Sequence, residues 1–390
     1  MPVPRVTPFE IRVDRSALDD LADRLARTRF ADDFGNDDWR YGVPGGYLRA
    51  VVEHWRERFD WRAQEAAMNR FAHFRVDLDG IPIHFVHERG RGPAPMPLIL
   101  THGWPWTFWD YEHLIGPLSD PARFGGDPAD AFDVVVPSLP GTAFSSPLRT
   151  TGIGVAATAE LWVRLMRDVL GYERFAAGGG DSGAYVTARL GHAYAPHLIG
   201  LHLNFPATVA MGTLASVRPD DYSPDEQHWL TEPGPQQRGT AAHMAVHTED
   251  PQTLAWAMND SPAGLAAWMI ERRRNWSDCG GDVERRFSKD QLLTTVSLYW
   301  FTATFHTSVR FYAESFRASW PLVHGRQPPV EVPTAIAVFP RELLRVPRRF
   351  MARQVNLARW TVMPRGGHFA PAEEPELMVD DLRAFFRDLR

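Results

Sequence analysis

Apolar residues near the start of the chain recur three and four positions apart, which is the spacing of an amphipathic helix. This spacing predicts helices over residues 17–28 and 46–59, and a third, shorter helix over residues 63–69. Ser16 stands where the N-cap of the first helix is expected. The aromatic residues on these helices are interpreted as packing surface. The chain therefore opens with a helical segment.

The pattern then changes to alternation of apolar and polar residues over residues 74–87, on either side of Asp79-Gly80. This dipeptide suits a type I′ turn, so a β-hairpin is predicted. Further on, short apolar runs alternate with helical spacing. Strands are expected over residues 98–101, 134–136, 175–178, 198–205, 334–339 and 360–363, and helices over residues 155–170, 185–194 and from 375 onward. Such alternation predicts a parallel, doubly wound α/β sheet.

One long segment interrupts the alternation of strands and helices. Residues 206–325 are rich in Trp, helical in pattern and broken by Pro and Gly. A helical insertion between two blocks of sheet is typical of a cap over the carboxyl ends of the strands, where open α/β folds bind ligands. The predicted organisation is an N-terminal extension over residues 1–90, a core in two parts over residues 91–205 and 326–390, and a helical cap over residues 206–325.

The sequence Gly-Gly-Asp-Ser-Gly at residues 179–183 lies between a predicted strand and a predicted helix. In a nucleophile elbow, small residues make room for a reactive side chain on a strained turn, which makes Asp181 a candidate carboxylate nucleophile. Read one position later, the same turn makes Ser182 a candidate serine nucleophile. A turn with a helix-capping Asp or Ser and no chemistry is the third interpretation. The local pattern favours none of the three.

Two loops after the cap carry the partners that a nucleophile needs. Glu342 follows the predicted strand at 334–339, and His368 follows the predicted strand at 360–363. A nucleophile needs a general base, and the base needs a carboxylate that orients it. The order nucleophile, acid, histidine is that of the α/β-hydrolase sheet. The fold class predicted is therefore an α/β-hydrolase fold with a helical cap and an N-terminal helical extension.

The motif His-Gly-Trp-Pro follows the predicted strand at 98–101. In this fold that loop contributes to an oxyanion hole, so the backbone N–H of Trp104 is expected to act together with that of Ser182. Metal chemistry is not indicated, because the histidines have no ligand spacing such as His-Glu-x-x-His.

Composition narrows the class of protein. The 390 residues have a net charge of −6 without a basic stripe, so a nucleic-acid partner is not expected. Cys279 is the single cysteine, which leaves no intrachain disulfide. No signal segment and no apolar run of membrane-spanning length is recognised, so a cytoplasmic protein without a membrane anchor is expected.

The chain resembles the microsomal-type epoxide hydrolases, which carry an N-terminal helical extension ahead of a capped α/β-hydrolase core. The resemblance covers nearly the whole sequence and rests on motifs spread along it. These are Leu25-Ala26-Arg27-Thr28-Arg29-Phe30, Phe59-Asp60-Trp61-Arg62, His102-Gly103-Trp104-Pro105, Gly179-Gly180-Asp181, Asn259-Asp260-Ser261-Pro262, Leu298-Tyr299-Trp300 and Gly366-Gly367-His368-Phe369.

The resemblance implies roles for particular residues. That family uses an Asp nucleophile, so Asp181 is preferred to Ser182, with His368 as the base that activates water and Glu342 as its partner. Arg310-Phe311-Tyr312-Ala313-Glu314 resembles the cap motif whose tyrosine polarises the epoxide, which gives Tyr312 that role, whereas Tyr299 is expected in the core. The implied reaction turns an epoxide and water into a vicinal diol through an Asp181 ester and needs no cofactor.

Three positions depart from the family pattern. Ser182 stands where the family usually has Trp, and residues 141–145 differ from the usual Gly-Tyr-Gly-x-Ser. Counting back from Asn259-Asp260-Ser261-Pro262 to the second cap tyrosine leads to His243. A ring N–H can replace a phenol as hydrogen-bond donor, so His243 is the candidate substrate-binding residue.

Other functions remain open on the sequence. A haloalkane dehalogenase-like hydrolase shares the Asp nucleophile, but Ser182 offers no indole to a halide. A serine esterase using Ser182 and a catalytically inactive binding protein are the further alternatives. Trp104, Trp106, Phe108 and Trp109 indicate a bulky, apolar epoxide as substrate. A homodimer is compatible with the sequence.

Overall fold

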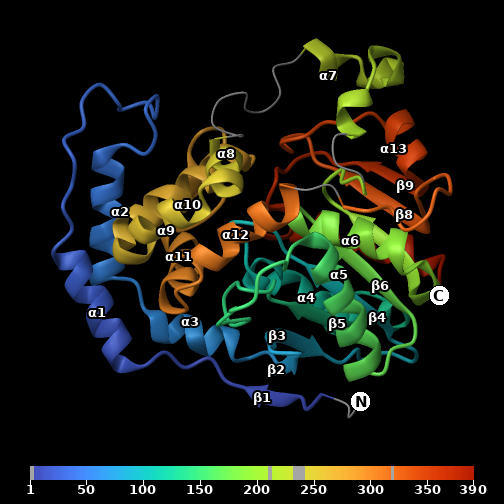
Figure 1. The fold of residues 1–390 in the computed structure, drawn as a ribbon, viewed down its shortest axis with the longest axis horizontal. Coiled ribbons are helices and arrows are strands. Elements are labelled where there is room, and N and C mark those ends of the chain that lie inside the picture. The colour runs from blue at the N-terminus through green and yellow to red at the C-terminus, as the bar shows by residue number, and fades with distance from the viewer. Residues whose placement is uncertain (1–3, 210–212, 232–241, 318–319) are drawn as a thin grey trace.

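A single mixed β-sheet runs through the molecule (Figure 1). The computed structural model describes residues 4–209, 213–231, 242–317 and 320–390, and within them nine strands pair in the order β1-β2-β3-β5-β4-β6-β7-β8-β9. Their bounds are β1 Thr7–Phe9, β2 His73–Leu78, β3 Ile81–Glu88, β4 Met96–Thr101, β5 Phe132–Pro137, β6 Phe175–Gly179, β7 Leu198–Leu203, β8 Val330–Val338 and β9 Val355–Val362.

The prediction that the strands alternating with helices form a parallel sheet is confirmed, and the predicted hairpin adds an antiparallel part to it. Strands β5, β4 and β6 to β9 are parallel, whereas β1, β2 and β3 are antiparallel and β3 joins the sheet by antiparallel pairing with β5. The predicted hairpin turn is confirmed, with φ of 58° at Asp79 and 83° at Gly80. The hairpin extends the sheet because β3 is buried, and buried backbone groups need hydrogen-bond partners.

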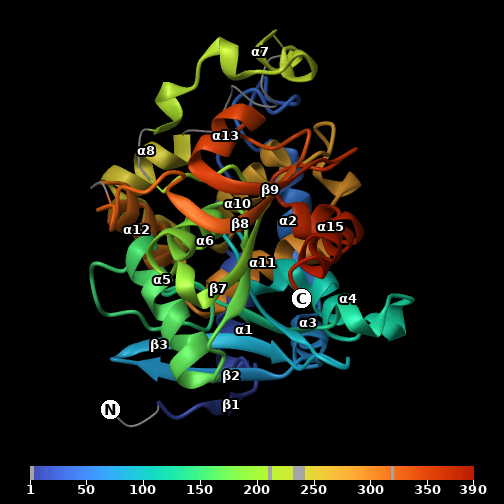
Figure 2. The same cartoon turned by 90° about the vertical axis from the view of Figure 1, so that its right-hand side faces the viewer.

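Helices cover both faces of the sheet (Figure 2). Helices α4 (Glu112–Ser119) and α15 (Pro375–Arg387) share one apolar core with the sheet, and α5 (Val155–Arg164) and α6 (Ser182–Ala193) share another. The short helix α13 (Arg348–Gln354) packs against β9, whereas α14 (Ala370–Glu373) contacts α4 and α15. Because the central strands are parallel, the loops after β4, β6, β8 and β9 meet at one edge of the sheet.

The N-terminal helices pack against helices of the predicted cap rather than against the sheet alone (Figure 1). Leu25 and Trp55 of the first two helices share a third core with Leu265 and Met269 of α10. The N-terminal helices are α1 Arg15–Ala26, α2 Gly45–Glu57 and α3 Trp61–Met68, and those of the predicted cap are α7 His228–Thr231, α8 Ala242–Glu249, α9 Pro251–Asp260, α10 Pro262–Trp276, α11 Lys289–Phe301 and α12 Phe305–Phe316.

Several predicted boundaries were wrong by a few residues. Helix α1 begins at Arg15 after Asp14, so Ser16 lies inside the helix and is not its N-cap. Helix α6 begins directly after Asp181, three residues earlier than expected. The helix predicted over 155–170 leaves α5 through a π-helical turn, and Gly171 ends it with φ of 78°. Residues 210–212, 232–241 and 318–319 of the predicted cap lie outside the described residues.

Two kinds of feature are absent from the described residues. None of the helices found there is both long enough and apolar enough to span a membrane. Likewise, no group of three His, Cys, Asp or Glu side chains in that part of the chain is arranged to hold a metal ion.

Candidate active site

Asp181 occupies a strained turn between β6 and α6. Its φ of 50° and ψ of −129° are rare for a residue with a side chain. The surrounding glycines leave no space for a Cβ atom: one at Gly179 would lie 2.6 Å from the carbonyl of Gly183, and one at Gly183 would overlap the carbonyl oxygen of Thr101. The glycines therefore permit the tight approach of β4 to the elbow.

The structure brings Asp181, His368 and Glu342 together. His368 Nε2 lies 3.2 Å from Asp181 Oδ2, and His368 Nδ1 lies 2.6 Å from Glu342 Oε1. The side chains of His368 and Glu342 are buried, whereas the Asp181 side chain keeps 15% exposure. Glu342 Oε1 also accepts the backbone N–H of Leu343 at 2.6 Å, which fixes the carboxylate toward the ring. The histidine is thus held between two carboxylates.

The same geometry distinguishes between Asp181 and Ser182 as candidate nucleophiles. Asp181 Oδ1 accepts the backbone N–H of Trp104 at 2.9 Å, and the N–H of Ser182 also stabilises the carboxylate. The Asp181 side chain makes none of the hydrogen bonds to the N–H groups of the second or third residue of α6 that define an N-cap, which argues against the interpretation as a helix cap. Ser182 is buried as the first residue of α6. The residue presented to the histidine is therefore the aspartate.

The charges of Asp181 and His368 stabilise one another. Burial raises the pKa of the Asp181 carboxyl, but the hydrogen bond and charge of His368, with the two backbone N–H groups, bring it below its ordinary value. Burial lowers the pKa of His368, but the charges of Glu342 and Asp181 outweigh this and raise it to about 10. At neutral pH the unliganded site therefore holds an ionised aspartate beside an imidazolium.

The loop after β4 is held by buried hydrogen bonds. His102 Nδ1 donates to the carbonyl of Gly103 at 2.8 Å, while its Nε2 accepts the N–H of Leu139 at 3.0 Å. Burial lowers the pKa of His102 to about 4, so the ring is neutral, as these bonds require. Tyr299 donates to the carbonyl of Trp106 at 2.8 Å and is buried, which confirms that it belongs to the core.

Tyr312 of α12 and His243 of α8 lie side by side in the predicted cap. Their ring centroids are 5.5 Å apart with perpendicular planes, and His243 stacks on the indole of Trp104 at 5.7 Å. The Tyr312 hydroxyl is buried without a hydrogen-bond partner in the described part of the chain. Burial, and then the charge of Asp181, raise the pKa of Tyr312 well above its ordinary range. The phenol therefore stays protonated as a donor.

His247 is a residue that the sequence analysis missed. It lies one helical turn after His243 and is fully buried against Trp104, with ring centroids 4.5 Å apart. Its Nε2 accepts the indole N–H of Trp268 at 3.3 Å, so the proton of the neutral ring is on Nδ1, an atom that has no partner in the described residues. Burial, with His243 and Arg272, lowers the pKa of His247 to about 2. The His-x-x-x-His spacing was the signal available.

The aromatic residues after β4 do not all reach the site. Trp104 faces the cap histidines, and the Trp106 ring lies 5.5 Å from His368. Phe108 instead packs on the buried His84 at 4.9 Å, and Trp109 belongs to the same core. Only the two tryptophans Trp104 and Trp106 therefore support the prediction of a bulky substrate. Phe108 and Trp109 are buried in the short helical turn that begins after residue 107.

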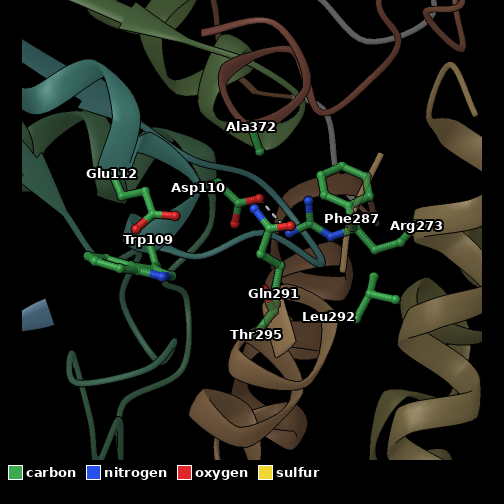
Figure 3. Close-up of a pocket in the computed structure, with 9 residues that line it drawn as sticks. All are labelled: Trp109, Asp110, Glu112, Arg273, Phe287, Gln291, Leu292, Thr295 and Ala372. Atoms are coloured by element: carbon green, nitrogen blue, oxygen red, sulfur yellow. Dashed lines mark hydrogen bonds and ion pairs between the residues drawn. The ribbon is translucent and has the colours of Figure 1, made fainter. Parts of the chain in front are cut away.

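A buried ion pair beside this loop was also missed. Arg273 of α10 pairs with Asp110 at 2.5 Å, next to a small cavity of about 30 Å³ (Figure 3). The guanidinium also lies over the ring of Phe369, 4.0 Å from its centroid. The pair joins α10 to the loop after β4 and to the residue that follows His368. Long-range pairs of this kind leave no local pattern in a sequence.

Two family models match the chain. Residues 96–375 match the alpha/beta hydrolase fold, and residues 6–111 match the epoxide hydrolase N terminus. The first match covers more than half of the chain, so the protein is an α/β hydrolase.

Similarity to known proteins identifies the family within the α/β hydrolases. A protein of Stigmatella aurantiaca whose name places it among epoxide hydrolases is 41% identical over 99% of this chain and 86% of its own. Epoxide hydrolase 1 of Sus scrofa is 32% identical over 97% of this chain and 88% of its own. The crystal structure of juvenile hormone epoxide hydrolase from the silkworm Bombyx mori matches with a TM-score of 0.87 and 26% identity, covering 99% of this chain and 95% of that one. The chain belongs to the epoxide hydrolase family.

The pairing of His368 with Asp181 gives a testable prediction. Asp181→Asn is expected to lower the pKa of His368 from about 10, because one of the two carboxylates that raise it loses its charge. An NMR titration of the His368 ring nitrogens would measure this, with Asp290→Asn, which removes an exposed carboxylate beside His54, as control. A His368 pKa that stays unchanged in Asp181→Asn would contradict the ion pair.

Proposed function

We propose that Asp181 is the nucleophile of an epoxide hydrolase reaction and that His368 and Glu342 hydrolyse the resulting ester. The observation that carries the proposal is the position of the Asp181 carboxylate, between the N–H of Trp104 at 2.9 Å and His368 Nε2 at 3.2 Å. One carboxylate oxygen faces donors that can hold an oxyanion, and the other faces the base. This arrangement suits attack by the carboxylate followed by attack of water on its carbonyl carbon.

In the first step an Asp181 oxygen attacks an epoxide carbon, and the carbon–oxygen bond of the ring breaks. The electron pair of that bond moves to the ring oxygen, which accepts a proton or a hydrogen bond from Tyr312. A buried phenol without another partner is suited to this role, because a charge that develops on the oxygen completes its hydrogen bonding. The second donor is proposed to be His243, whose ring lies beside that of Tyr312.

In the second step water attacks the carbonyl carbon of the Asp181 ester, and His368 takes the proton of the water. Ester formation removes the charge of Asp181, which is one of the two that raise the pKa of His368. The imidazolium can then pass its proton, through Tyr312 or solvent, to the oxygen freed by ring opening, and the neutral ring becomes the required base. The N–H groups of Trp104 and Ser182 are positioned to hold the oxyanion. Its collapse breaks the ester carbon–oxygen bond, and the departing oxygen takes the proton of the new carboxylic acid, which releases the diol with Asp181 again a carboxylate and His368 again an imidazolium.

The predicted cap is proposed to select an apolar epoxide. Trp104, Trp276 and Tyr312 present aromatic rings around the cap histidines, with His243 and Trp276 centroids 4.7 Å apart. An apolar ring or chain loses little on leaving water for such surroundings, whereas a charged substrate would lose its hydration. The burial of these rings supports an aryl or alkyl epoxide as the substrate class.

The identity of the nucleophile can be tested with paired variants. Asp181→Ala is expected to abolish diol formation, because it removes the attacking oxygen, whereas Ser182→Ala should retain most of the activity. In a single turnover in oxygen-18 water, the label should enter the Asp181 carboxylate and not the diol. An inactive Ser182→Ala variant, or a fully labelled diol in that turnover, would contradict the proposal.

The role of Tyr312 is tested by removing its hydroxyl. Tyr312→Phe is expected to slow alkylation about a hundredfold, since a single donor of this type contributes about 3 kcal/mol to the transition state. Tyr299→Phe is the matched control, because Tyr299 is an equally buried tyrosine whose hydroxyl is already bound to Trp106. Rapid-quench measurement of the alkylation rate compares the two. Equal rates in both variants would exclude Tyr312 as the donor.

A further inference from the structure

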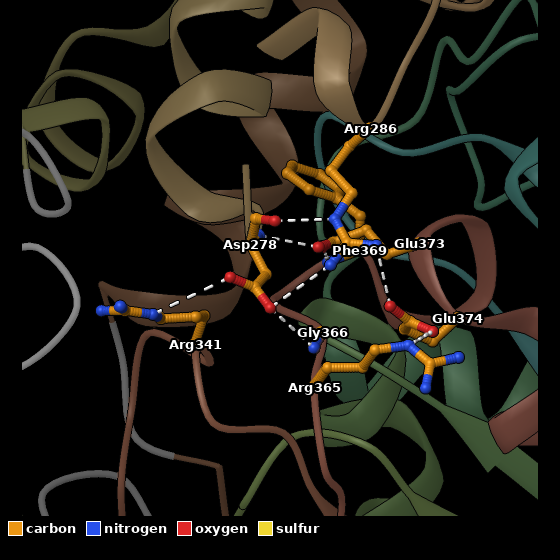
Figure 4. A network of polar contacts seen from close by, with 8 residues as sticks. All are labelled: Asp278, Arg286, Arg341, Arg365, Gly366, Phe369, Glu373 and Glu374. Carbon is orange, nitrogen blue, oxygen red and sulfur yellow. Dashed lines mark hydrogen bonds and ion pairs between the residues drawn. The ribbon is translucent and has the colours of Figure 1, made fainter. Parts of the chain in front are cut away.

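A network of polar contacts joins the loop of His368 to the segment that follows α10 (Figure 4). Four backbone N–H groups take part. The N–H of His368 donates to the carbonyl of Trp276 at 2.9 Å, and that of Gly366 donates to Asp278 Oδ2 at 3.0 Å. The N–H of Asp278 and that of Phe369 both donate to Glu373. Hydrogen bonds of the backbone therefore connect the loop of His368 to the segment after α10, although the two lie far apart in the sequence.

Glu373 is the side chain that connects both segments. Its Oε2 accepts the N–H of Asp278 at 2.7 Å, and its Oε1 accepts the N–H of Phe369, the residue after His368, at 2.9 Å. The residue is 8% exposed, and burial raises the pKa of its carboxyl to about 7 in spite of these two donors and of Arg286. Burying a carboxyl group costs free energy unless hydrogen bonds compensate for the lost hydration, and Glu373 has such bonds to the backbone of both segments.

The two segments leave each other no room to shift. A Cβ atom at Gly367 would lie 2.7 Å from the nitrogen of Asp278 and 2.8 Å from the carbonyl oxygen of Trp276. Trp276 in turn places its ring 5.4 Å from that of His368. Because the two segments are in direct contact, a shift of one of them after the loss of a hydrogen bond at Glu373 would also move the other. Both His368 and Trp276 would then change position.

The same loop is also joined to the one that carries Glu342. The N–H of Arg341 donates to the carbonyl of Gly366 at 3.0 Å, and the side chain of Arg341 reaches Asp278 at 3.9 Å. Around Glu373, Arg286 connects the Asp278 carbonyl at 2.6 Å with Glu374 at 2.9 Å. The base, its carboxylate partner and the segment after α10 thus form one unit.

We infer that Glu373 is a positioning residue for the hydrolytic step, holding His368 within reach of the water that attacks the Asp181 ester. This inference rests on the proposed function. Alkylation uses the oxygen of Asp181 and the donors opposite it, so it depends little on the exact placement of the imidazole. Proton abstraction from water requires Nε2 within hydrogen-bond distance, and small displacements reduce its rate strongly.

The test is rapid quench of single turnovers with styrene oxide as the probe, read by intact mass. Glu373→Gln keeps the size of the side chain but presents an NH₂ group to one of the two N–H donors. It is expected to slow hydrolysis of the alkyl-enzyme about tenfold or more while alkylation stays within about twofold, so the adduct accumulates. In steady state, kcat and KM should fall together.

Glu65→Gln is the control for a merely structural effect. Glu65 is a similarly buried glutamate in α3 that accepts a backbone N–H from Val13 and the indole N–H of Trp61 at 2.7 Å, away from Asp181. It should lower the melting temperature without changing the ratio of the two rates. Asp278→Ala, which removes the acceptor for Gly366, provides a second variant if Glu373→Gln does not fold, and a smaller slowing of hydrolysis is expected.

The outcomes separate this inference from the proposed function. Unchanged hydrolysis in folded Glu373→Gln, or equal slowing of both steps, would overturn the positioning role while the Asp181 ester stands. If no adduct forms even in His368→Gln, the proposed function fails. In that case the NMR titration of His368 tests whether Glu373 positions the histidine. A His368 pKa that falls in Glu373→Gln but not in Glu65→Gln would support positioning, and an unchanged value would overturn it.

Discussion

The close crossing of β4 and the turn after β6 is the constraint on which the site depends. A side chain at Gly103 would overlap Asp181 itself, and one at Gly183 would overlap the backbone of Thr101. Without these side chains the turn closes tightly, and Asp181 is held at a φ of 50° between a strand and a helix. Its carboxylate lies where Oδ1 accepts the N–H of Trp104 at 2.9 Å. The strain is offset by the packing of the sheet around it.

Burial determines the charge state of every group around this turn. Among buried groups only paired charges are favourable, so Asp181 is ionised beside a protonated His368, while Tyr312 and His247 stay neutral. Before substrate binds, the site therefore already holds Asp181 as an ionised carboxylate, the form that can attack an epoxide. In the proposed mechanism, the loss of one negative charge on ester formation then converts the imidazolium into a base. One set of contacts thereby serves two different steps.

The order of the elements and the Asp181, Glu342 and His368 set could be predicted because each follows a strand with a clear apolar pattern. The early start of α6 and the N-cap of α1 could not, because the ends of helices depend on contacts with the rest of the fold. The antiparallel joining of the hairpin, the Asp110–Arg273 pair and the bonds of Glu373 involve residues distant in the sequence. His247 had a spacing signal, but a helical histidine pair is uninformative until its surroundings are known.

The central claim is that Asp181 becomes covalently bound to the substrate. Its most direct test is the incubation of His368→Gln with styrene oxide, followed by intact mass and peptide mapping. Without the base the ester should persist, so one added substrate mass is expected, located on Asp181. An adduct on Ser182, or an unmodified protein at saturating substrate while the wild-type protein forms diol, would contradict it.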